Sequence, residues 1–510
     1  MSNSSRIAKN TLALYGRSLL VLVVSLYTSR VFLNALGVQD YGLYNVVGGV
    51  ISMLGFLNTT MQATFQRYYN VAMGKGKEGE VKTLFRLSLT VQFLLALVVV
   101  LLGETVGLWF VNNKLVIPEG RMEAAQILYQ VTIVSFVISV FKGPFAAIIT
   151  AYEKMSVYAL FSIIETFLKL GNAIIIMNAR GDRLILFSFL TLLITIVDIS
   201  LYIVFCKKKI PTTDIGFNWK KDSLKNMLSF STWSTLGTLA YTMKSQGVNI
   251  VLNLFFGTVV NAARGVASQV LHAVNQFINS FQTAFRPQLT KLYASGDYDA
   301  AMRLYYGATK LSYYLIFTIS LPILLETPYI LHIWLGDVVP EYSSIFTRII
   351  LLTAFVSAFA NPTSCIAYAT GRIKKFSIVV SVFNLLIVPV AYLFLKLGFG
   401  PESAMIVSFV ITILVQFIRL LVVADMTVMK VGDYIRNVVI PIIFYTALSL
   451  LFPLPLCRFL PEGWLRLILV LVVSVVSSLC FAWLVGLNKM EKAFVLSKIK
   501  SIKYFNRFIK

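Results

Sequence analysis

Charge is scarce in this sequence of 510 residues: charged residues make up 13% of it, whereas hydrophobic residues make up 58%. Soluble globular proteins carry about 25% charged residues. A soluble core could not bury so large a share of apolar side chains. The composition therefore predicts an integral membrane protein.

Residues that support metal, redox or nucleotide chemistry are also few. The two histidines, His272 and His332, show no metal-ligand spacing, and the four cysteines lie far apart and form no CxxC pair. The sequence contains no GxxxxGK[ST] loop, which argues against ATP hydrolysis by this chain. We expect no catalytic residue, no metal and no cofactor, and hence a protein that is not an enzyme.

Basic residues are in excess and give a formal net charge of +23. They lie mostly in short loops between apolar runs and not on one continuous face, so we interpret them as topology signals and expect no nucleic-acid partner. With the N-terminus inside, roughly 27 Lys and Arg fall on the cytoplasmic side and roughly 7 on the other. The positive-inside rule predicts a multi-pass protein with both termini in the cytoplasm.

Apolar runs of the length needed to cross the hydrocarbon core, about 20 residues, recur along the chain. They are too long for barrel strands of about ten residues and show no period-two alternation, which favours an all-α helical bundle. The fourteen predicted spans lie near residues 11–34, 43–66, 84–110, 123–150, 155–178, 184–206, 226–254, 259–285, 307–333, 343–369, 376–397, 402–424, 437–456 and 464–487.

An internal repeat organises these spans. The segment FLNTTMQATFQR, which starts at Phe56, resembles FINSFQTAFR, which starts at Phe277. Two such repeats, packed about a pseudo-two-fold axis, can rock against each other and expose a central site to each side in turn. We predict two pseudo-symmetric six-helix bundles, two further helices and a basic amphipathic cytoplasmic tail, at residues 1–210, 211–430, 431–488 and 489–510.

Four segments carry a family resemblance. They are RVFLNALGVQDYGLYNVV from Arg30, GPFAAIITAYEKMSVYALFSIIETFLKL from Gly143, ARGVASQVLHAVNQFINSFQTAFRPQLTKLYASGD from Ala263 and NPTSCIAYATGRIKKF from Asn361. With them the sequence resembles the polysaccharide flippases of the MOP exporter superfamily (multidrug, oligosaccharidyl-lipid and polysaccharide exporters). The LG-x-x-DYG-L-Y and A-TG-x-I-KK elements are typical of the polysaccharide branch.

The resemblance implies a flippase of the bacterial inner membrane that moves undecaprenyl-pyrophosphate-linked oligosaccharide units to the periplasmic leaflet, for O-antigen, capsule or exopolysaccharide assembly. It implies contacts with membrane lipids, and partners such as a polysaccharide polymerase and chain-length machinery. It also implies that the last two helices extend a groove for the lipid tail. A multidrug or small-molecule antiporter and a flippase for the peptidoglycan lipid precursor, both of the same superfamily, stay open as alternatives.

Cations within the spans are the candidates for substrate binding, because a cation at mid-membrane costs about 2.5–3.5 kcal/mol. Four others lie near the cytoplasmic ends of their spans, where snorkelling accounts for them: Arg67, Arg86, Lys310 and Arg419. The resemblance implies that cavity cations hold the lipid pyrophosphate, and arginine suits phosphate because its contacts are charge-assisted and often bidentate. The candidates are Arg30, Lys244 and Arg264, followed by Arg17 and Lys142.

The first three candidates are favoured by the repeat. Pairing the first helix with the seventh places Arg30 and Lys244 within a turn of each other across the pseudo-symmetry axis, and Arg264 would approach from the side of Lys244. A packing or topology role is the alternative for each. Lys142 precedes Gly143-Pro144, which should break or kink the fourth helix.

Two intramembrane acids, Glu165 and Asp198, are the candidates for coupling transport to protons or sodium ions. Glu165 also lies four residues before Lys169, the right spacing for an intrahelical ion pair. A purely structural pairing with nearby cations is therefore the alternative for both acids.

Overall fold

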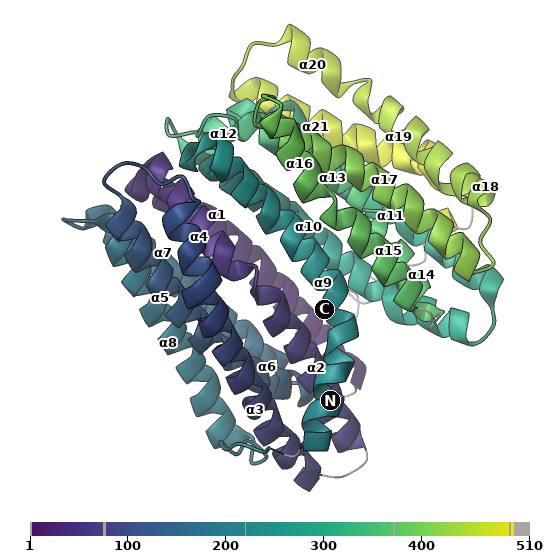
Figure 1. Cartoon of the computed structure of the whole chain (residues 1–510). Helices are drawn as coiled ribbons and strands as arrows, with labels where there is room; N and C mark the ends of the chain where they lie inside the picture. The colour runs from purple at the N-terminus through teal and green to yellow at the C-terminus, as the bar shows by residue number, and fades with distance from the viewer. Residues whose placement is uncertain (1–2, 75–77, 220, 371–372, 489–490, 494–510) are drawn as a thin grey trace. The chain divides into compact units, whose positions relative to one another are not determined.

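The computed structural model describes residues 3–74, 78–219, 221–370, 373–488 and 491–493, and all regular structure in these residues is helical (Figure 1). Eleven of the helices in the described residues are long and apolar enough to cross a membrane. The predicted all-α membrane fold is confirmed. The predicted amphipathic tail from residue 489 onward lies outside the described residues, apart from 491–493.

The eleven candidate spans match eleven of the fourteen predicted ones. The other three predicted spans, 43–66, 226–254 and 259–285, are also helical. The first of them runs from the end of one long helix into the next, and the other two belong to long helices that are less apolar on average. The location of both termini in the cytoplasm stays a prediction.

The chain forms two compact units. The first comprises Met1–Val266, Trp334–Ser343 and Ser381–Ala404, and the second comprises Ala267–Ile333, Ser344–Val380 and Met405–Lys510. The division of the chain into bundles at 210 and 430 stays a prediction. The helices of the first unit are α1 (Asn3–Ser52), α2 (Gly55–Gly74), α3 (Glu78–Leu102), η1 (Gly103–Gly107), α4 (Leu108–Asn113), α5 (Met122–Val140), α6 (Lys142–Ala151), α7 (Met155–Asn178), α8 (Arg183–Lys209), α9 (Lys221–Phe256), the start of α10 (Thr258–Ala294) and α16 (Ile387–Lys396).

The second unit contains the rest of α10 and most of the helices that follow it. They are α11 (Tyr298–Leu325), α12 (Thr327–Leu335), α13 (Ser343–Ser357), α14 (Ala360–Ala369), α15 (Ile373–Leu385), α17 (Glu402–Met426), α18 (Val431–Tyr434), η2 (Ile435–Val439), α19 (Ile440–Leu450), α20 (Pro453–Phe459), α21 (Trp464–Phe481) and η3 (Ala482–Gly486). The ends of α12 and α15 and the starts of α13 and α17 belong to the first unit.

Two glycines with positive φ mark corresponding turns. Gly37 (φ 77°) interrupts α1, and Gly257 (φ 73°) separates α9 from α10. Glycine adopts this conformation without the steric cost that a Cβ would bring. The two turns are 220 positions apart (257 − 37), and the repeated segments at Phe56 and Phe277 are 221 apart (277 − 56). The two glycine turns therefore lie at nearly the same spacing as the two repeated segments.

Helices of the first unit pack side by side along their lengths. α7 lies along α1, α8 along α5 and α6 against α2 (Figure 1). Aromatic residues such as Phe65, Phe85 and Phe145 fill the core between α2, α3 and α6. Tyr69 shares this core, and its hydroxyl donates to Ser88 Oγ at 2.8 Å, which satisfies the polar end of a fully buried ring.

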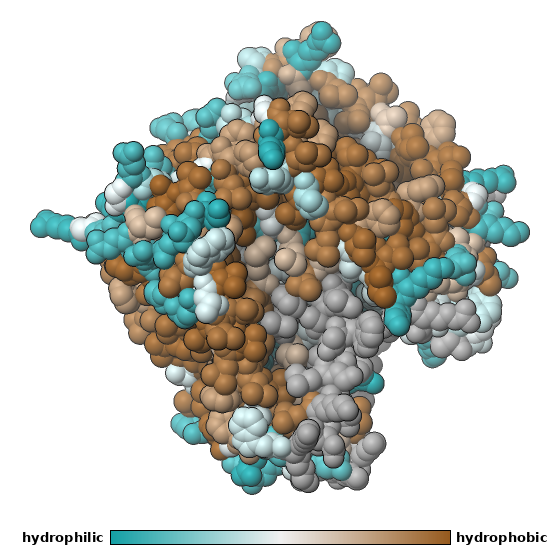
Figure 2. Space-filling view, viewed as in Figure 1, coloured by the Kyte–Doolittle hydropathy of each residue, from teal (hydrophilic) through white to brown (hydrophobic). Residues whose placement is uncertain are grey.

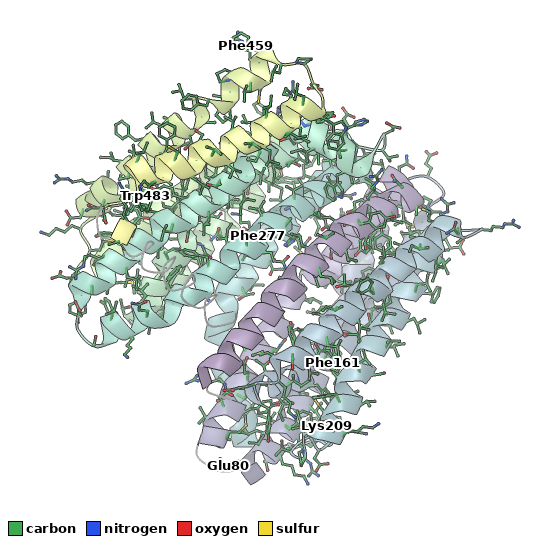
Figure 3. The ribbon with its side chains drawn as sticks, turned by 180° about the vertical axis from the view of Figure 1, so that it is seen from behind. Glu80, Phe161, Lys209, Phe277, Phe459 and Trp483 are labelled. Carbon is green, nitrogen blue, oxygen red and sulfur yellow. The ribbon has the colours of Figure 1, made fainter. Side chains whose placement is uncertain are left out.

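Charged residues fix the ends of these helices. Asp182 caps α8, because its Oδ1 accepts hydrogen bonds from the backbone N–H groups of Leu184 and Ile185. Three lysines, ending at Lys209, occupy the last turn of α8, where the helix dipole favours cations. Lys209 and Glu80, near the start of α3, lie at the same end of the first unit (Figure 3).

The segment that follows α8 runs back along α3. Asp214 forms ion pairs with Lys82 at 3.1 Å and with Arg86. Further along, the backbone N–H of Asn218 donates to Thr90 Oγ1 at 2.8 Å. Arg86, which we expected to snorkel, thus has a carboxylate partner within the protein.

The last two spans are built into the second unit by buried ion pairs. Lys310 on α11 lies 2.7 Å from Glu491, which follows η3, and its side chain is only 4% exposed. Glu326, at the end of α11, is fully buried and accepts a hydrogen bond from Arg466 on α21 at 2.8 Å. The expectation that Lys310 snorkels is wrong, because Glu491 gives its ammonium group a buried partner.

The outer surface is apolar, as a bilayer requires. Hydrophobic side chains cover most of the visible face and hydrophilic ones gather near loops and helix ends (Figure 2). Phe459 in α20, at 81% exposure, is an extreme case (Figure 3). Such surface would be a liability in water and is compatible with lipid chains.

Substitution of Gly42 by alanine tests the close approach of helices in the first unit. A Cβ at Gly42 would lie 1.9 Å from the backbone oxygen of Thr258, so the helices must move apart. We expect Gly42→Ala to destabilise the protein by about 1–3 kcal/mol, seen as a lower unfolding temperature in detergent.

Gly171→Ala is the matched control, because nothing lies within 4 Å of its Cβ position and α7 is helical there. Alanine should be neutral or stabilising by up to about 1 kcal/mol at this site. Equal unfolding temperatures for the two variants would contradict the proposed role of Gly42.

Candidate intramembrane site

Four charged side chains meet inside the first unit on three consecutive helices. Lys142 Nζ on α6 lies 2.6 Å from Asp198 Oδ2 on α8 and 3.6 Å from Glu165 Oε2 on α7. Lys169, one turn after Glu165, lies 2.6 Å from its Oε1, so the predicted i,i+4 pair is present. We name these four residues the charge cluster; they carry no formal net charge.

Local sequence positions Lys142. α5 ends at Val140 and α6 begins at Lys142, so the helix break predicted at Gly143-Pro144 is confirmed. Pro144 falls in the first turn of α6, where its missing N–H breaks no helical hydrogen bond. A Cβ at Gly143 would lie 2.5 Å from the side chain of Gln92 on α3, which explains a glycine there.

Burial differs among members of the charge cluster. The Asp198 side chain is 9% exposed, whereas that of Lys169 is 52% exposed. Lys142 also lies over the ring of Tyr202, 4.9 Å from its centre, in a cation–π contact. Asp198 Oδ1 is buried and accepts no hydrogen bond, which leaves one carboxylate oxygen able to take a proton or another donor.

The two acids of the charge cluster lie deep within their helices. Glu165 is ten residues after the first residue of α7, Met155, and Asp198 is eleven before the last of α8, Lys209. At 1.5 Å per residue these positions are about 15–17 Å from the helix ends, and the hydrocarbon core is about 30 Å thick. Both predicted coupling acids therefore meet near the middle of their helices, with Lys142, a predicted substrate contact, between them. Their roles in coupling and binding stay predictions.

Arg264 and Lys244 lie on adjoining helices of the first unit. Arg264 Nη2 on α10 donates to the backbone oxygen of Ser245 on α9, at 2.6 Å, and Ser245 directly follows Lys244. Arg264 Nε is buried and has no hydrogen-bond partner. Among the described residues, Arg264 has no carboxylate partner, so its charge is available to an anionic ligand.

Arg30 lies on α1 beside the turn that follows α12. A Cβ at Gly336 would be 3.7 Å from Arg30 Nη2, and Trp334 Nε1 donates to the backbone oxygen of Leu26 at 2.8 Å. Arg30 is half-buried. Whether it shares a cavity with Lys244 stays a prediction, and the side chain of Arg17 lies outside the described residues.

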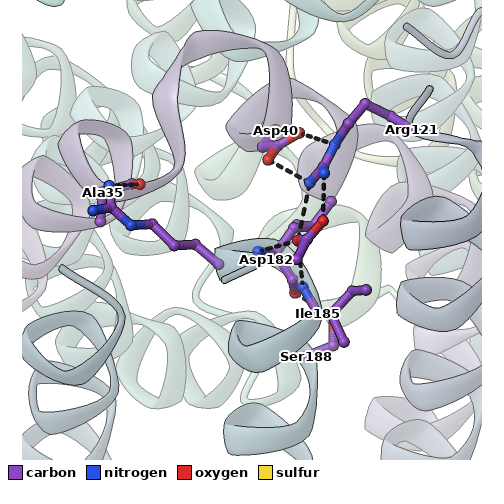
Figure 4. A network of polar contacts seen from close by, with 8 residues as sticks. Ala35, Asp40, Arg121, Asp182, Ile185 and Ser188 are labelled. Carbon is purple, nitrogen blue, oxygen red and sulfur yellow. Dashed lines mark hydrogen bonds and ion pairs between the residues drawn. The ribbon is translucent and has the colours of Figure 1, made fainter. Parts of the chain in front are cut away.

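A second polar network lies at the N-terminal ends of α5 and α8 (Figure 4). Arg121, just before α5, donates to both carboxylate oxygens of Asp40, at 2.9 and 2.6 Å, and also binds Asp182. Arg183 Nη1 donates to the backbone oxygen of Ala35, just before the Gly37 turn, at 3.0 Å. Asp40 is the first residue of the DYG motif, and no role was predicted for it.

Three buried asparagines form a third network that sequence reasoning missed. Asn253 on α9 exchanges hydrogen bonds with the backbone of Val116, and its Nδ2 also donates to Asn261 Oδ1 at 3.0 Å. Asn261 Nδ2 donates to the backbone oxygen of Asn249 at 2.7 Å, and Asn249 Nδ2 donates to that of Asn45. Asparagine recurring within apolar runs was the available signal, because buried amides need partners.

The chain is a multi-pass membrane protein with the fold of MOP superfamily transporters and flippases. The lipid II flippase MurJ, in an inward closed conformation, matches with a TM-score of 0.67 and 13% identity, over 93% of this chain and 98% of MurJ. An inward-facing multidrug resistance MATE family transporter of the MOP superfamily matches at 0.64 and 15%, over 80% and 98%. A MOP superfamily transporter from Pyrococcus furiosus Vc1 (DSM3638) matches at 0.60 and 18%, over 82% and 95%.

Sequence comparison gives a weaker likeness. No known protein-family profile matches the chain. A protein of Bacillus subtilis (strain 168), named uncharacterized membrane protein EpsK, is 19% identical over 336 residues. The match spans 64% of this chain and 64% of EpsK, which is less than two thirds of either. The fold is therefore established by the likeness to solved structures.

A double-mutant cycle tests the charge cluster. Lys142→Met should destabilise the protein by about 3–5 kcal/mol, because it leaves Asp198 charged and buried without its cation. Lys142→Met combined with Asp198→Asn should restore much of that loss, because neither charge remains. The measurement is thermal unfolding of the purified protein in detergent.

Lys169→Met is the control for removal of a cation from the charge cluster. Its half-exposed side chain should contribute no more than about 1 kcal/mol. Strictly additive effects of the Lys142 and Asp198 substitutions would show that the two side chains are not coupled.

Asp182 gives a pH-dependent prediction. The hydrogen bond from Arg121 lowers the pKa of Asp182, which lies outside the spans. Its folded pKa is below the unfolded value of about 3.9, so its stabilisation is present above that pH and is lost as pH falls through the folded pKa. We expect Asp182→Asn to cost up to about 1 kcal/mol at neutral pH and nothing in strong acid.

Unfolding temperatures of wild type and variant between pH 3 and pH 8 would measure this. Asparagine can still cap α8, so the difference isolates the charge. Glu119→Gln, in the exposed loop before Arg121, is the control. A wild-type advantage that grows in acid would refute the role of the ion pair.

Proposed function

We propose that this protein is a flippase of the bacterial inner membrane that exports undecaprenyl-pyrophosphate-linked oligosaccharide units for surface polysaccharide synthesis. The substrate is amphiphilic: a long isoprenoid chain, a pyrophosphate and a glycan. Such a carrier needs a surface for the lipid, cations for the pyrophosphate and a route by which the glycan crosses. A polysaccharide polymerase as partner is part of this proposal.

The observation that carries the proposal is the extent of the likeness to a lipid flippase. MurJ covers 93% of this chain, whereas the MATE family transporter covers 80% and the Pyrococcus furiosus transporter 82%. The smaller difference, 11% of 510 residues, is about as long as segment 431–488, which holds the last two spans. Ion pairs at Lys310 and Glu326 tie that segment into the second unit, which supports a role for it in handling a lipid.

The cations of the first unit support the proposal that the substrate carries a pyrophosphate. Arg264 keeps a buried Nε without a hydrogen-bond partner, and its Nη2 donates to a backbone carbonyl and not to a carboxylate. A phosphate oxygen would satisfy such a guanidinium through a charge-assisted hydrogen bond. Lys244 on the adjoining helix adds a second positive charge at the same level. Anionic head groups are favoured over the cationic drugs that an acid-rich site would select.

The charge cluster supplies a means of coupling to an ion gradient. Protonation of Asp198 removes the negative charge that holds Lys142, and deprotonation restores the pair. Because Lys142 joins α6, α7 and α8, the two protonation states favour different packing of these helices. One protonation state can favour the conformation in which the central site is open to the cytoplasm, and the other state the conformation in which it is open to the periplasm. Transport by rocking bundles requires two such conformations.

Complementation tests the function. Deletion of the gene should abolish surface polysaccharide while cells survive, and the wild-type gene should restore it. Arg264→Ala should fail to restore export although the protein reaches the membrane at normal level, because the pyrophosphate loses its guanidinium partner. Arg180→Ala, an exposed cation in the loop before α8, is the control and should restore export fully.

Other phenotypes would identify the alternatives. Lysis on deletion would indicate the peptidoglycan lipid precursor as substrate, and new drug sensitivity with intact polysaccharide would indicate an antiporter. Full export by Arg264→Ala would remove Arg264 from the binding site.

A further inference from the structure

Arg419 of the second unit lies on the protein-facing side of its helix. On α17, Gln416 and Leu420 are buried, at 8% and 7% exposure, whereas Phe417 and Leu421 are exposed at 53% and 46%. Arg419, at the position between the two buried residues and one turn before the buried Val423, is half-buried and keeps a buried Nε without a hydrogen-bond partner. This face of α17 packs against protein and not lipid, and the snorkelling expected for Arg419 stays a prediction.

A second arginine is positioned by the neighbouring helices α10 and α14. Arg286 Nη2 on α10 donates to Asn361 Oδ1 on α14 at 2.8 Å. Asn361 Nδ2 in turn donates to Gln282 Oε1, one turn before Arg286, at 2.5 Å. The amide of Asn361 thus orients the guanidinium through a neutral contact, which leaves the charge of Arg286 uncompensated.

Both arginines lie on helices that contact α14. Arg286 reaches it through Asn361, and Tyr368 on α14 lies within electrostatic range of both Arg286 and Arg419. Gln416, one turn before Arg419, donates to Thr363 on α14 and keeps a buried Oε1 without a partner. Three helices therefore contribute polar groups to one region of an otherwise apolar unit.

No acid among the described residues neutralises Arg286 or Arg419. In the part of the chain that the structure describes, neither Arg286 nor Arg419 forms an ion pair with a carboxylate. The acid that follows on α17, Asp425, binds Lys375 at 2.5 Å. Arg419 lies within a candidate span, where an uncompensated guanidinium group is costly unless an anion joins it. Arg286 is exposed, one residue beyond a predicted span, where it can reach the same anion.

We propose that Arg286 and Arg419, with the Tyr368 hydroxyl, form a binding site for the phosphate of a lipid head group. Guanidinium groups offer forked N–H donors that match phosphate oxygens, and the tyrosine adds an O–H donor. The arginines lie eight and seven residues before the ends of α10 and α17. At 1.5 Å per residue this is about 10–12 Å from those ends, within reach of a head group entering from the side that the charge distribution predicts to be cytoplasmic.

Binding of a phosphate group at this site does not depend on the proposed function. Only the identity of the lipid that carries the phosphate rests on it. A phospholipid of the bilayer and an isoprenoid pyrophosphate present the same chemistry to the two arginines. The residues of the site belong to the second unit, whereas Arg264 belongs to the first.

Binding to the purified full-length protein tests the site. The probes are inorganic pyrophosphate, farnesyl pyrophosphate and phosphatidylglycerol, with phosphatidylcholine as the zwitterionic comparison, each read by the rise in unfolding temperature. Arg419→Gln and Arg286→Gln should each weaken binding of the anionic probes at least tenfold. Arg419→Lys should give an intermediate loss, because it keeps the charge and loses the fork.

Lys375→Gln is the matched control: it removes a cation from the same region, but one that already has an acid partner, and should bind like wild type. Unliganded unfolding temperatures establish that each variant is folded. If Arg419→Gln does not fold, the exposed Arg286 provides the test alone. Stronger binding of farnesyl pyrophosphate than of phosphatidylglycerol supports the site and indicates a pyrophosphate lipid; equal binding supports it and indicates a bilayer lipid.

Wild-type affinity for every probe in Arg286→Gln and a folded Arg419→Gln would overturn the proposal. That result is independent of complementation, because export of polysaccharide can persist without this site. Conversely, tight binding here with no effect of gene deletion on polysaccharide would overturn the proposed function and leave the site standing.

Discussion

A charged side chain deep within a bilayer, beyond the reach of snorkelling, has to find its partner in the protein or in a bound ligand, because hydrocarbon offers none. The helices of this protein obey that constraint in two ways. Some charges are neutralised internally, as in the charge cluster and in the pairs of Lys310 with Glu491 and Arg466 with Glu326. Others, such as Arg264 and Arg419, keep buried donors that no side chain satisfies.

This distinction separates structural charges from functional ones. A neutralised pair fixes helix packing and, where an acid can be protonated, offers two states. An uncompensated arginine stays ready for an anion. The proposed transport cycle needs both kinds, since an anionic lipid has to be held while the helices around it change their packing.

Much of the fold follows from the sequence, because the length of an apolar run and the distribution of lysine and arginine report directly on the bilayer. The break before Lys142 and the i,i+4 pair of Glu165 with Lys169 were also predictable, since both arise from local spacing. Snorkelling was the wrong interpretation for Lys310. Depth along a helix is readable from sequence, whereas the face that a residue presents to its neighbours depends on tertiary packing.

The candidate site was only partly predictable for the same reason. Glu165, Asp198 and Lys142 were each identified as unusual, but their contact joins residues 56 positions apart on different helices. The ion pair of Asp40 with Arg121 was not predicted, because the basic residues of the loops had been interpreted as topology signals. A contact between two residues that are far apart in the sequence produces no repeating pattern by which a single sequence could reveal it.

The ion pair between Lys310 and Glu491 changes where the structural core ends. Glu491 follows the last span, in a stretch that by sequence alone belongs to the cytoplasmic tail, yet its carboxylate partners a lysine that is almost entirely buried. A chain shortened to the end of the last helix would keep every span and still leave an ammonium group stranded between helices. Tags, fusions and truncations at this end should therefore begin after residue 493, since the carboxylate of Glu491 neutralises the buried ammonium group of Lys310.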